Sequence, residues 1–188
     1  MRPEDQEEFE ASSFIESRLA YEGKIINLRL DTYQFDEEPK VAEIIEHSGA
    51  AAIIPIDSSG KIILARQWRR AAEEILLELP AGMLEKGEEP LACAKRELQE
   101  ETGFGSDHIT PLGGFYTAPG FCTEYIYLFV AQELYPAPLQ ADDDEVIELQ
   151  LFSLDQIDEL IEKNQITDAK TIAGIFRYHL FLQREGAK

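Results

Sequence analysis

The chain has 188 residues, of which 37 are acidic and 17 are basic, and its formal net charge is −20. Nucleic acid and anionic membrane surfaces both require a basic footprint on the protein, so this charge argues against either as a partner. The same charge repels a phosphate substrate at long range. A phosphate site in this chain therefore needs local cations, namely a metal and a few arginines.

The length is sufficient for one domain with a good core and a small appendage. No uninterrupted apolar run approaches the roughly 20 residues of a membrane helix. The chain begins MRPEDQEEFEASS, which is acidic and lacks the basic-then-apolar order of a secretory signal, so we expect a cytoplasmic protein. Cys93 and Cys122 have no metal-type spacing, and we expect both to be reduced.

In chain order, residues 1–12 are expected to form an acidic tail or a short helix. Residues 14–45 contain short alternating segments separated by turn signals, which predict about three antiparallel strands. A unit of this size is not stable alone, so residues 13–47 are predicted to be a β-subdomain that packs on the main domain or on a second copy of the chain.

The main domain, residues 48–188, alternates strands with helices. Two apolar runs joined at residues 57–60 predict a hairpin, and residues 75–79 predict another strand. The remaining expected elements are a helix over about 90–102, strands within 107–121, 124–134 and 146–153, a helix over about 154–163 capped by Ser153, and a helix over about 168–184 capped by Thr167 or Asp168. This alternation predicts an α/β fold in which helices cover both faces of a mixed sheet.

The first of these helices has clear start and stop signals. Pro90 suits the first turn, where its missing N–H has no partner, and Gly103 suits the left-handed position just past the end. Leu91, Ala94 and Leu98 make an apolar stripe that is expected to face the core.

The same helix gathers carboxylates along one edge. At 3.6 residues per turn, Glu97 and Glu101 lie about 40° apart and Glu100 lies on the neighbouring row. Arg96 stands one turn before Glu100, at a spacing that permits an ion pair. Gathered carboxylates repel each other unless a cation joins them, and hard divalent cations prefer oxygen ligands. The alternative is an ordinary solvated acidic surface.

The spacing of the acidic segment favours the metal site, because the whole segment fits a known pattern. It resembles, with no departure, the G-x5-E-x7-R-E-U-x-E-E-x-G-U box of the Nudix hydrolases, where U is aliphatic or large and apolar. The matching residues are Gly82, Glu88, Arg96, Glu97, Leu98, Glu100, Glu101, Gly103 and Phe104. The resemblance implies an α/β/α sandwich with a mixed sheet, together with the small N-terminal antiparallel β-subdomain.

Features outside the box resemble the ADP-ribose pyrophosphatase branch of that family. Pro119 follows Gly103 by sixteen residues within YTAPGFCTE, and ELPAG leads into the box. The segments EGKIINLRLD and QITDAKTIAGIF also look like this branch, so the resemblance extends from about residue 13 to near the end of the chain.

The resemblance implies roles for individual residues. Glu97 and Glu101 would ligate metal directly, Glu100 directly or through water, and Ala81 through its carbonyl. The implied cofactor is Mg²⁺ or Mn²⁺, with two to three ions per active site. Loop and helix would be oriented by Gly82, Glu88, Arg96 and Gly103.

Four further residues are predicted to bind substrate. Arg69 matches a phosphate-contacting arginine, Glu124 a residue at the diphosphate–ribose end, and His47 a basic substrate-binding position, while Pro119 belongs to the branch signature. The alternatives are a surface strand arginine for Arg69, an exposed strand-start carboxylate for Glu124, and an ordinary strand-end residue for His47.

An acidic segment after the strand at 124–134 holds the candidates for the residue that activates water. Relatives often carry D-E-x-E where this chain has Asp142-Asp143-Asp144-Glu145. Asp143 is one methylene shorter than the usual glutamate, so Glu145 or a metal-bound hydroxide is the alternative. The alternative interpretation is that residues 142–145 form a solvated acidic loop with no catalytic role.

The resemblance implies metal-dependent hydrolysis of ADP-ribose to AMP and ribose 5-phosphate. The first alternative is a nucleotide-sugar pyrophosphatase that prefers a GDP-hexose or a UDP-sugar, because the box binds the diphosphate and not the base. The second is a non-catalytic domain that senses nucleotides. The family also implies a homodimer with exchanged N-terminal strands.

Overall fold

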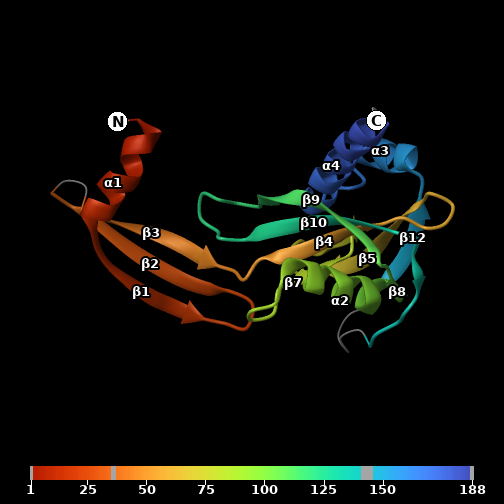
Figure 1. The fold of residues 1–188 in the computed structure, drawn as a ribbon. Coiled ribbons are helices and arrows are strands. Elements are labelled where there is room, and N and C mark those ends of the chain that lie inside the picture. The colour runs from red at the N-terminus through yellow and green to blue at the C-terminus, as the bar shows by residue number, and fades with distance from the viewer. Residues whose placement is uncertain (1, 35–36, 141–145, 187–188) are drawn as a thin grey trace. The chain divides into compact units, whose positions relative to one another are not determined.

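The structure is a computed structural model that describes residues 2–34, 37–140 and 146–186 (Figure 1). Its elements in chain order are α1 (Pro3–Ser13), β1 (Phe14–Glu22), β2 (Asn27–Gln34), β3 (Pro39–Glu46), β4 (Ala50–Pro55), β5 (Ile62–Arg69), β6 (Glu74–Glu78), β7 (Ala81–Met83), α2 (Pro90–Thr102), β8 (Phe104–Gly105), β9 (His108–Tyr116), β10 (Tyr125–Gln132), β11 (Tyr135–Pro136), β12 (Glu148–Phe152), α3 (Leu154–Glu162) and α4 (Ala169–Glu185). Within those three described ranges, no helix is long and apolar enough to cross a membrane.

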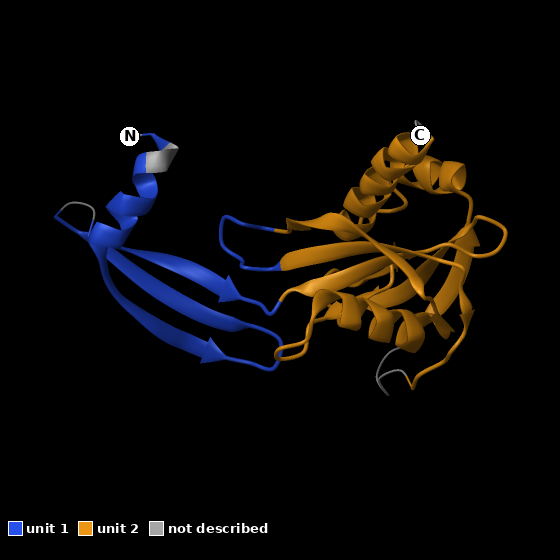
Figure 2. Ribbon diagram, viewed as in Figure 1, with its two compact units in different colours: residues 1–48, 118–124 blue, residues 49–117, 125–188 orange. Residues whose placement is uncertain are grey.

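The chain divides into two compact units, which Figure 2 shows in different colours. Unit 1 comprises residues 1–48 and 118–124, and unit 2 comprises residues 49–117 and 125–188. In unit 1, α1 precedes an antiparallel sheet of order β1-β2-β3. The loop 118–124 joins this unit through β3: Ile45 N–H donates to the Phe121 carbonyl at 2.8 Å, and Thr123 N–H donates to the Ile45 carbonyl at 2.9 Å.

Unit 1 buries little apolar surface of its own. Every residue of β1 is exposed, and both clusters that form the hydrophobic core consist of residues outside unit 1. The buried residues described on and beside its strands are polar: Asp31 accepts a hydrogen bond from the Ser17 hydroxyl at 2.7 Å. Three strands without an apolar core need packing from elsewhere.

Unit 2 is built on a mixed four-stranded sheet of order β7-β4-β10-β9, in which β4 and β10 are parallel and the other pairs are antiparallel. A second sheet has the order β12-β5-β6. Helix α2 lies on one side of the mixed sheet and α4 on the other (Figure 1). The predicted α/β class with helices on both faces is confirmed.

The two faces of β4 explain this layering. Ala51 and Ile53 pack with Leu98 of α2, whereas Ala52 and Ile54 pack in the cluster that includes Ile175 of α4. Successive side chains of a strand point to opposite faces, so a strand covered on both sides is apolar throughout. All six residues of β4 are buried accordingly.

The predicted hairpin at residues 57–60 is wrong in its pairing. The turn itself forms, with Gly60 N–H donating to the Asp57 carbonyl at 3.0 Å, and a single bridge joins Ile56 and Ile62. Beyond that bridge the strands separate, because β10 and β7 occupy the two edges of β4 while β6 and β12 occupy those of β5. Neither strand has an edge left for the other.

The helix signals are mostly confirmed. Helix α2 begins at Pro90 and ends before Gly103, whose φ of 74° is left-handed. Ser153 caps α3, and of the two candidates for α4 Asp168 is the cap, accepting from Thr171 N–H at 2.9 Å. The apolar stripe is wrong at Leu91, which is exposed in the first turn, whereas Cys93 is buried.

Candidate active site

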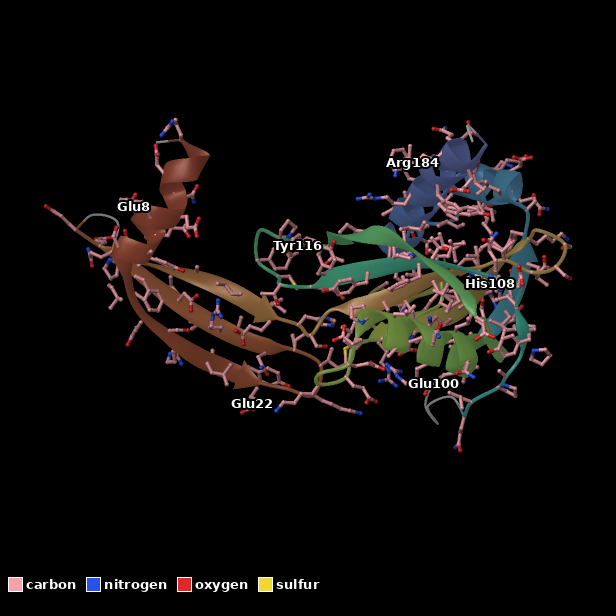
Figure 3. All side chains as sticks on the ribbon, viewed as in Figure 1. Glu8, Glu22, Glu100, His108, Tyr116 and Arg184 are labelled. Atoms are coloured by element: carbon pink, nitrogen blue, oxygen red, sulfur yellow. The ribbon has the colours of Figure 1, made fainter. Side chains whose placement is uncertain are left out.

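The acidic residues of α2 lie on its buried side. Glu97 and Glu101 are each 8% exposed and share the core-facing arc of the helix with Ala94 and Leu98. Glu100 lies at the margin of that arc, and Figure 3 labels it on α2. The chain thus places two carboxylates where water is largely excluded, which is costly unless they are hydrogen-bonded or paired with cations.

Arg96 pairs with three glutamates of the box. Its Nε and Nη2 donate to the two oxygens of Glu88 at 3.0 Å each, and its Nη1 donates to Glu97 and, at 2.9 Å, to Glu100. The predicted pair of Arg96 with Glu100 is present. Hydrogen bonding from Arg96 holds the pKa of Glu88 below its usual range, and hydrogen bonding to Glu88 raises the pKa of Arg96.

Gly82 lies directly against the Glu97 carboxylate. A Cβ added at this position would come 1.8 Å from Glu97 Oε1, far inside contact distance. The missing side chain is therefore what allows the carboxylate to rest against the backbone of β7. The adjacent Ala81 N–H donates to Glu101 Oε2 at 3.1 Å, which fixes the second carboxylate on the same strand.

This arrangement supplies the donor set that a hard divalent cation requires, with carboxylate and carbonyl oxygens gathered beside one strand. Among the described residues, however, no three acidic, histidine or cysteine side chains have their ligand atoms grouped for an ion. The hydrogen bonds give the reason, because the Glu97 and Glu100 carboxylates turn toward Arg96 and that of Glu101 toward Ala81 N–H. The oxygen ligands of these residues and their positions on α2 and β7 suit a divalent metal ion. In this structure Arg96 is the cation that pairs with Glu97 and Glu100.

Arg69, at the end of β5, forms a two-bond fork with Glu78. Its Nε and Nη2 donate to Glu78 Oε1 and Oε2 at 2.8 Å each. Lys170 also donates to Glu78, and the Glu78 side chain is 1% exposed. Hydrogen bonding to Glu78 raises the pKa of Arg69, and the charge of Glu101 contributes in the same direction.

The other predicted substrate-binding residues lie in unit 1. His47 follows β3, its backbone N–H donates to Thr123 Oγ1 at 2.9 Å, and its Nε2 lies 3.6 Å from Glu124 Oε1. The structure thus brings His47 and Glu124 together. Pro119 lines a groove of about 690 Å³ in the same unit, beside Phe121. Grooves of this volume are in the range of small-molecule sites.

Asp143 and Glu145 fall outside the described residues, so both stay predictions. Glu78 and Lys170 were not predicted as site residues. The sequence holds one signal for Glu78, an acidic residue between leucines in the apolar strand segment ILLEL. Its partner Lys170 is 92 residues away, and only the packing of α4 brings the two together.

Comparison with known proteins identifies the class to which this fold and site belong. The family model of the NUDIX domain matches residues 46–174. The chain belongs to the Nudix hydrolase family. Its relatives place it in the ADP-ribose pyrophosphatase branch of that family. The protein is therefore a Nudix hydrolase enzyme.

Three relatives and one solved structure illustrate the likeness. "ADP-ribose pyrophosphatase" of Bacillus subtilis (strain 168) is 38% identical over 82% of this chain and 85% of that protein. "Methanol dehydrogenase activator" of Bacillus methanolicus is 36% identical over 86% and 89%. "GDP-mannose pyrophosphatase" of Yersinia pestis (strain Pestoides F) is 33% identical over 77% and 81%. A crystal structure of an ADP compounds hydrolase superposes with a TM-score of 0.82 at 25% identity, covering 93% of this chain and 95% of that one.

Proposed function

We propose that this enzyme hydrolyses the diphosphate bond of ADP-ribose to give AMP and ribose 5-phosphate. The observation that carries the proposal is the pair of buried carboxylates, Glu97 and Glu101, held beside Gly82 and Ala81 by short-range contacts. Buried carboxylates gathered in this way suit a cationic reaction centre better than a structural role.

Nudix hydrolases generally use divalent metals, and we propose Mg²⁺ or Mn²⁺ here, with two to three ions per site. The ligands would be Glu97, Glu100, Glu101 and the carbonyl of Ala81. When bound, such ions neutralise charge on the phosphoryl oxygens and lower the pKa of a water molecule.

The chain's own residues would bind and orient the substrate. Arg96 pairs with box carboxylates and limits their rotamers, and Glu88 holds Arg96 from the loop side. Arg69 has an edge of its guanidinium not used in the Glu78 fork, which suits a phosphate oxygen. His47, Pro119 and Glu124 of unit 1 are also proposed to bind substrate.

GDP-hexoses and UDP-sugars are the alternative substrates. The box carboxylates act on the diphosphate, so a GDP-hexose or a UDP-sugar would fit the same chemistry. A relative named for GDP-mannose supports keeping this alternative, whereas the relative with 38% identity is named for ADP-ribose. We therefore place ADP-ribose first.

We also propose that the enzyme is a homodimer in which unit 1 contributes exchanged N-terminal strands. The supporting observation is the apolar surface of unit 1: Phe14, Ile15, Leu19, Tyr21 and Val41 are all about half exposed. Exposed apolar side chains in such number on three strands mark an interaction surface.

A substrate panel tests the proposed function. Purified enzyme is incubated with ADP-ribose, GDP-mannose and UDP-glucose, with MgCl₂ or MnCl₂ or with EDTA, and products are resolved by ion-exchange chromatography. We expect AMP and ribose 5-phosphate from ADP-ribose in the presence of metal, and no turnover in EDTA. A clear preference for GDP-mannose or UDP-glucose would overturn the substrate assignment. Tight ADP-ribose binding without hydrolysis of any substrate would favour a nucleotide sensor.

A further inference from the structure

Glu78 is a buried carboxylate that two cations share. Arg69 donates to both of its oxygens, and Lys170, which is only 12% exposed, donates to Glu78 Oε2. A buried carboxylate needs such partners because desolvation disfavours its charge. The arginine fork gives each oxygen one hydrogen bond and balances the charge of Glu78, so Lys170 adds a second positive charge to an already neutral pair.

The fork leaves a definite part of Arg69 available. A guanidinium has five N–H donors in a rigid plane, and Glu78 uses one on Nε and one on Nη2. The Arg69 side chain is 40% exposed, in contrast to Glu78. Since Glu78 is fixed in the interior, the fork sets the plane of the guanidinium and the direction of its outer edge, which carries Nη1.

Lys170 changes the charge that this outer edge presents. Arg69 and Glu78 alone form a neutral pair, whereas Arg69, Glu78 and Lys170 together carry one positive charge. Asp168 lies 3.1 Å from the Lys170 ammonium, but it is the N-cap of α4 and accepts from Thr171 N–H and from the Thr171 hydroxyl. The helix N-terminus carries about half a positive charge and therefore offsets part of the Asp168 charge. Lys170 therefore makes the outer edge of Arg69 more attractive to an anion than the Arg69–Glu78 pair would be without it.

The same network is tied to the strand that carries the metal-site backbone. The Thr171 hydroxyl accepts from Leu79 N–H at 2.8 Å and is fully buried. Leu79 is two residues before Ala81, whose N–H binds Glu101. The start of α4 thus fixes both the Arg69 fork and the approach to β7.

A second observation concerns the same face of β5. Gln67 precedes Arg69 by two residues, so the two side chains share one face of the strand. Gln67 is 7% exposed, and its Nε2 has no hydrogen-bond partner among the described residues. Buried amide donors are rarely left unpaired, so this face is suited to meet a polar group of a ligand.

From these contacts we infer that Lys170, through Glu78, is a positioning residue that offsets the charge of Glu78 and keeps the Arg69 guanidinium oriented toward a substrate phosphate. Lys170 itself does not touch the substrate. The inference rests on the proposed function, because it needs a diphosphate substrate whose phosphate reaches Arg69.

The test compares variants at position 170 with a matched surface lysine. Lys170→Met removes the charge, Lys170→Gln keeps a donor for Glu78 without the charge, and Lys170→Arg keeps both. Lys163, which pairs with Glu159 on the exposed surface of α3, serves as the control Lys163→Met. For each, kcat and KM for ADP-ribose are measured with saturating MgCl₂, ADP-ribose affinity is measured calorimetrically in EDTA, and folding is checked by thermal unfolding.

We expect Lys170→Met to raise KM about tenfold or more and to change kcat by no more than about twofold. The contact of Arg69 with a substrate phosphate is made equally in the ground state and the transition state, so weakening it affects binding alone. Lys170→Arg should restore KM to near the wild-type value, and Lys163→Met should leave it unchanged. The KM of Arg69→Ala sets the upper limit for the KM of the Lys170 variants, because Lys170 acts through Arg69. If Lys170→Met fails to fold, the raised KM is expected in Lys170→Gln.

Unchanged KM and unchanged affinity in folded Lys170→Met or Lys170→Gln would overturn the inference. So would a KM in either variant that exceeds that of Arg69→Ala. A wild-type enzyme that does not hydrolyse ADP-ribose would instead refute the proposed function, so the two failures are distinguishable.

Discussion

The Glu97 carboxylate rests on the α-carbon of Gly82, so closely that a methyl group there would lie 1.8 Å from Glu97 Oε1. The glycine of the box is thus needed for space and not for an unusual backbone angle, in contrast to Gly103, whose φ is 74°. This relationship makes the position of one proposed metal ligand depend on the absence of a side chain on the neighbouring strand.

Gly82→Ala is therefore expected to abolish most activity while the fold persists. The added methyl displaces the flexible end of Glu97, and overpacking of this kind costs about 1–3 kcal/mol. Turnover of ADP-ribose and the urea midpoint measure the two effects. Gly60→Ala is the control: its φ of 79° strains an alanine, but no atom lies within 4 Å of the added Cβ. It should lose stability and keep activity; equal activity losses in both variants would contradict this account.

Glu101→Gln is expected to lower turnover by about 100-fold or more, since a neutral amide is a poor ligand for a hard cation. The fold should remain, because the amide oxygen can still accept from Ala81 N–H. The measurement is kcat as a function of MgCl₂ concentration, together with thermal unfolding. Glu85→Gln, a matched change at an exposed residue of the same segment, should behave as wild type. Near-normal activity of Glu101→Gln in MgCl₂ would show that the metal assignment is wrong.

Arg96→Lys is expected to weaken metal binding by about 10- to 100-fold, the usual cost of losing a residue that orients ligands. A lysine has one ammonium and cannot hold Glu88 by a fork while also reaching Glu97 and Glu100. The apparent affinity for Mn²⁺, from activity and from paramagnetic titration, measures the effect. Arg66→Lys makes the same change at an arginine that pairs with Glu148 on the surface. No loss in Arg96→Lys relative to Arg66→Lys would mean that Arg96 does not orient the ligands.

Cys93 gives a pH-dependent prediction for stability. Burial, with help from the charges of Glu88 and Glu97, raises the pKa of its thiol to about 12. A raised pKa means that the folded state holds the proton more tightly than the unfolded state, whose thiol has a pKa of ~8.5. The stabilisation is complete below that pH and is lost as pH rises toward 12.

Urea midpoints of wild type and Cys93→Ala, measured from pH 7 to pH 10.5, check this expectation. As pH rises above ~8.5, the urea midpoint of the wild type should fall relative to that of Cys93→Ala. Only the wild type has the Cys93 thiol, whose ionisation favours the unfolded state. Parallel curves over the whole range would show that Cys93 does not titrate differently in the folded state.

The exposed apolar side chains of unit 1 predict dimerisation. Sedimentation velocity at micromolar concentration should give a dimer, and Leu19→Asp should shift it toward monomer because a charge on an apolar interface is costly. Leu151→Asp alters an equally exposed leucine in unit 2 and should stay dimeric. A monomeric wild type would refute the dimer.

Local signals were sufficient for the acidic helix. Proline at its start, glycine past its end and the i, i+4 spacing of Arg96 and Glu100 act within a few residues, so α2 and that ion pair follow from the sequence. The family box adds the expected ligands on the same short segment. By contrast, Leu91 is exposed although it shares the helical period of Ala94 and Leu98, because periodicity alone does not show which turns of a helix are covered.

The sequence by itself determined the chemistry: which oxygens are available, on which helix, and in what spacing. Only the tertiary structure decided that β4 and β5 part into different sheets, and that Lys170 joins Arg69 on Glu78. The physical reason is the same in both cases. The partner of a strand edge or of a buried charge is decided by tertiary packing. Lys170 and Glu78 are 92 positions apart in the sequence, so no local periodicity predicts that they make contact.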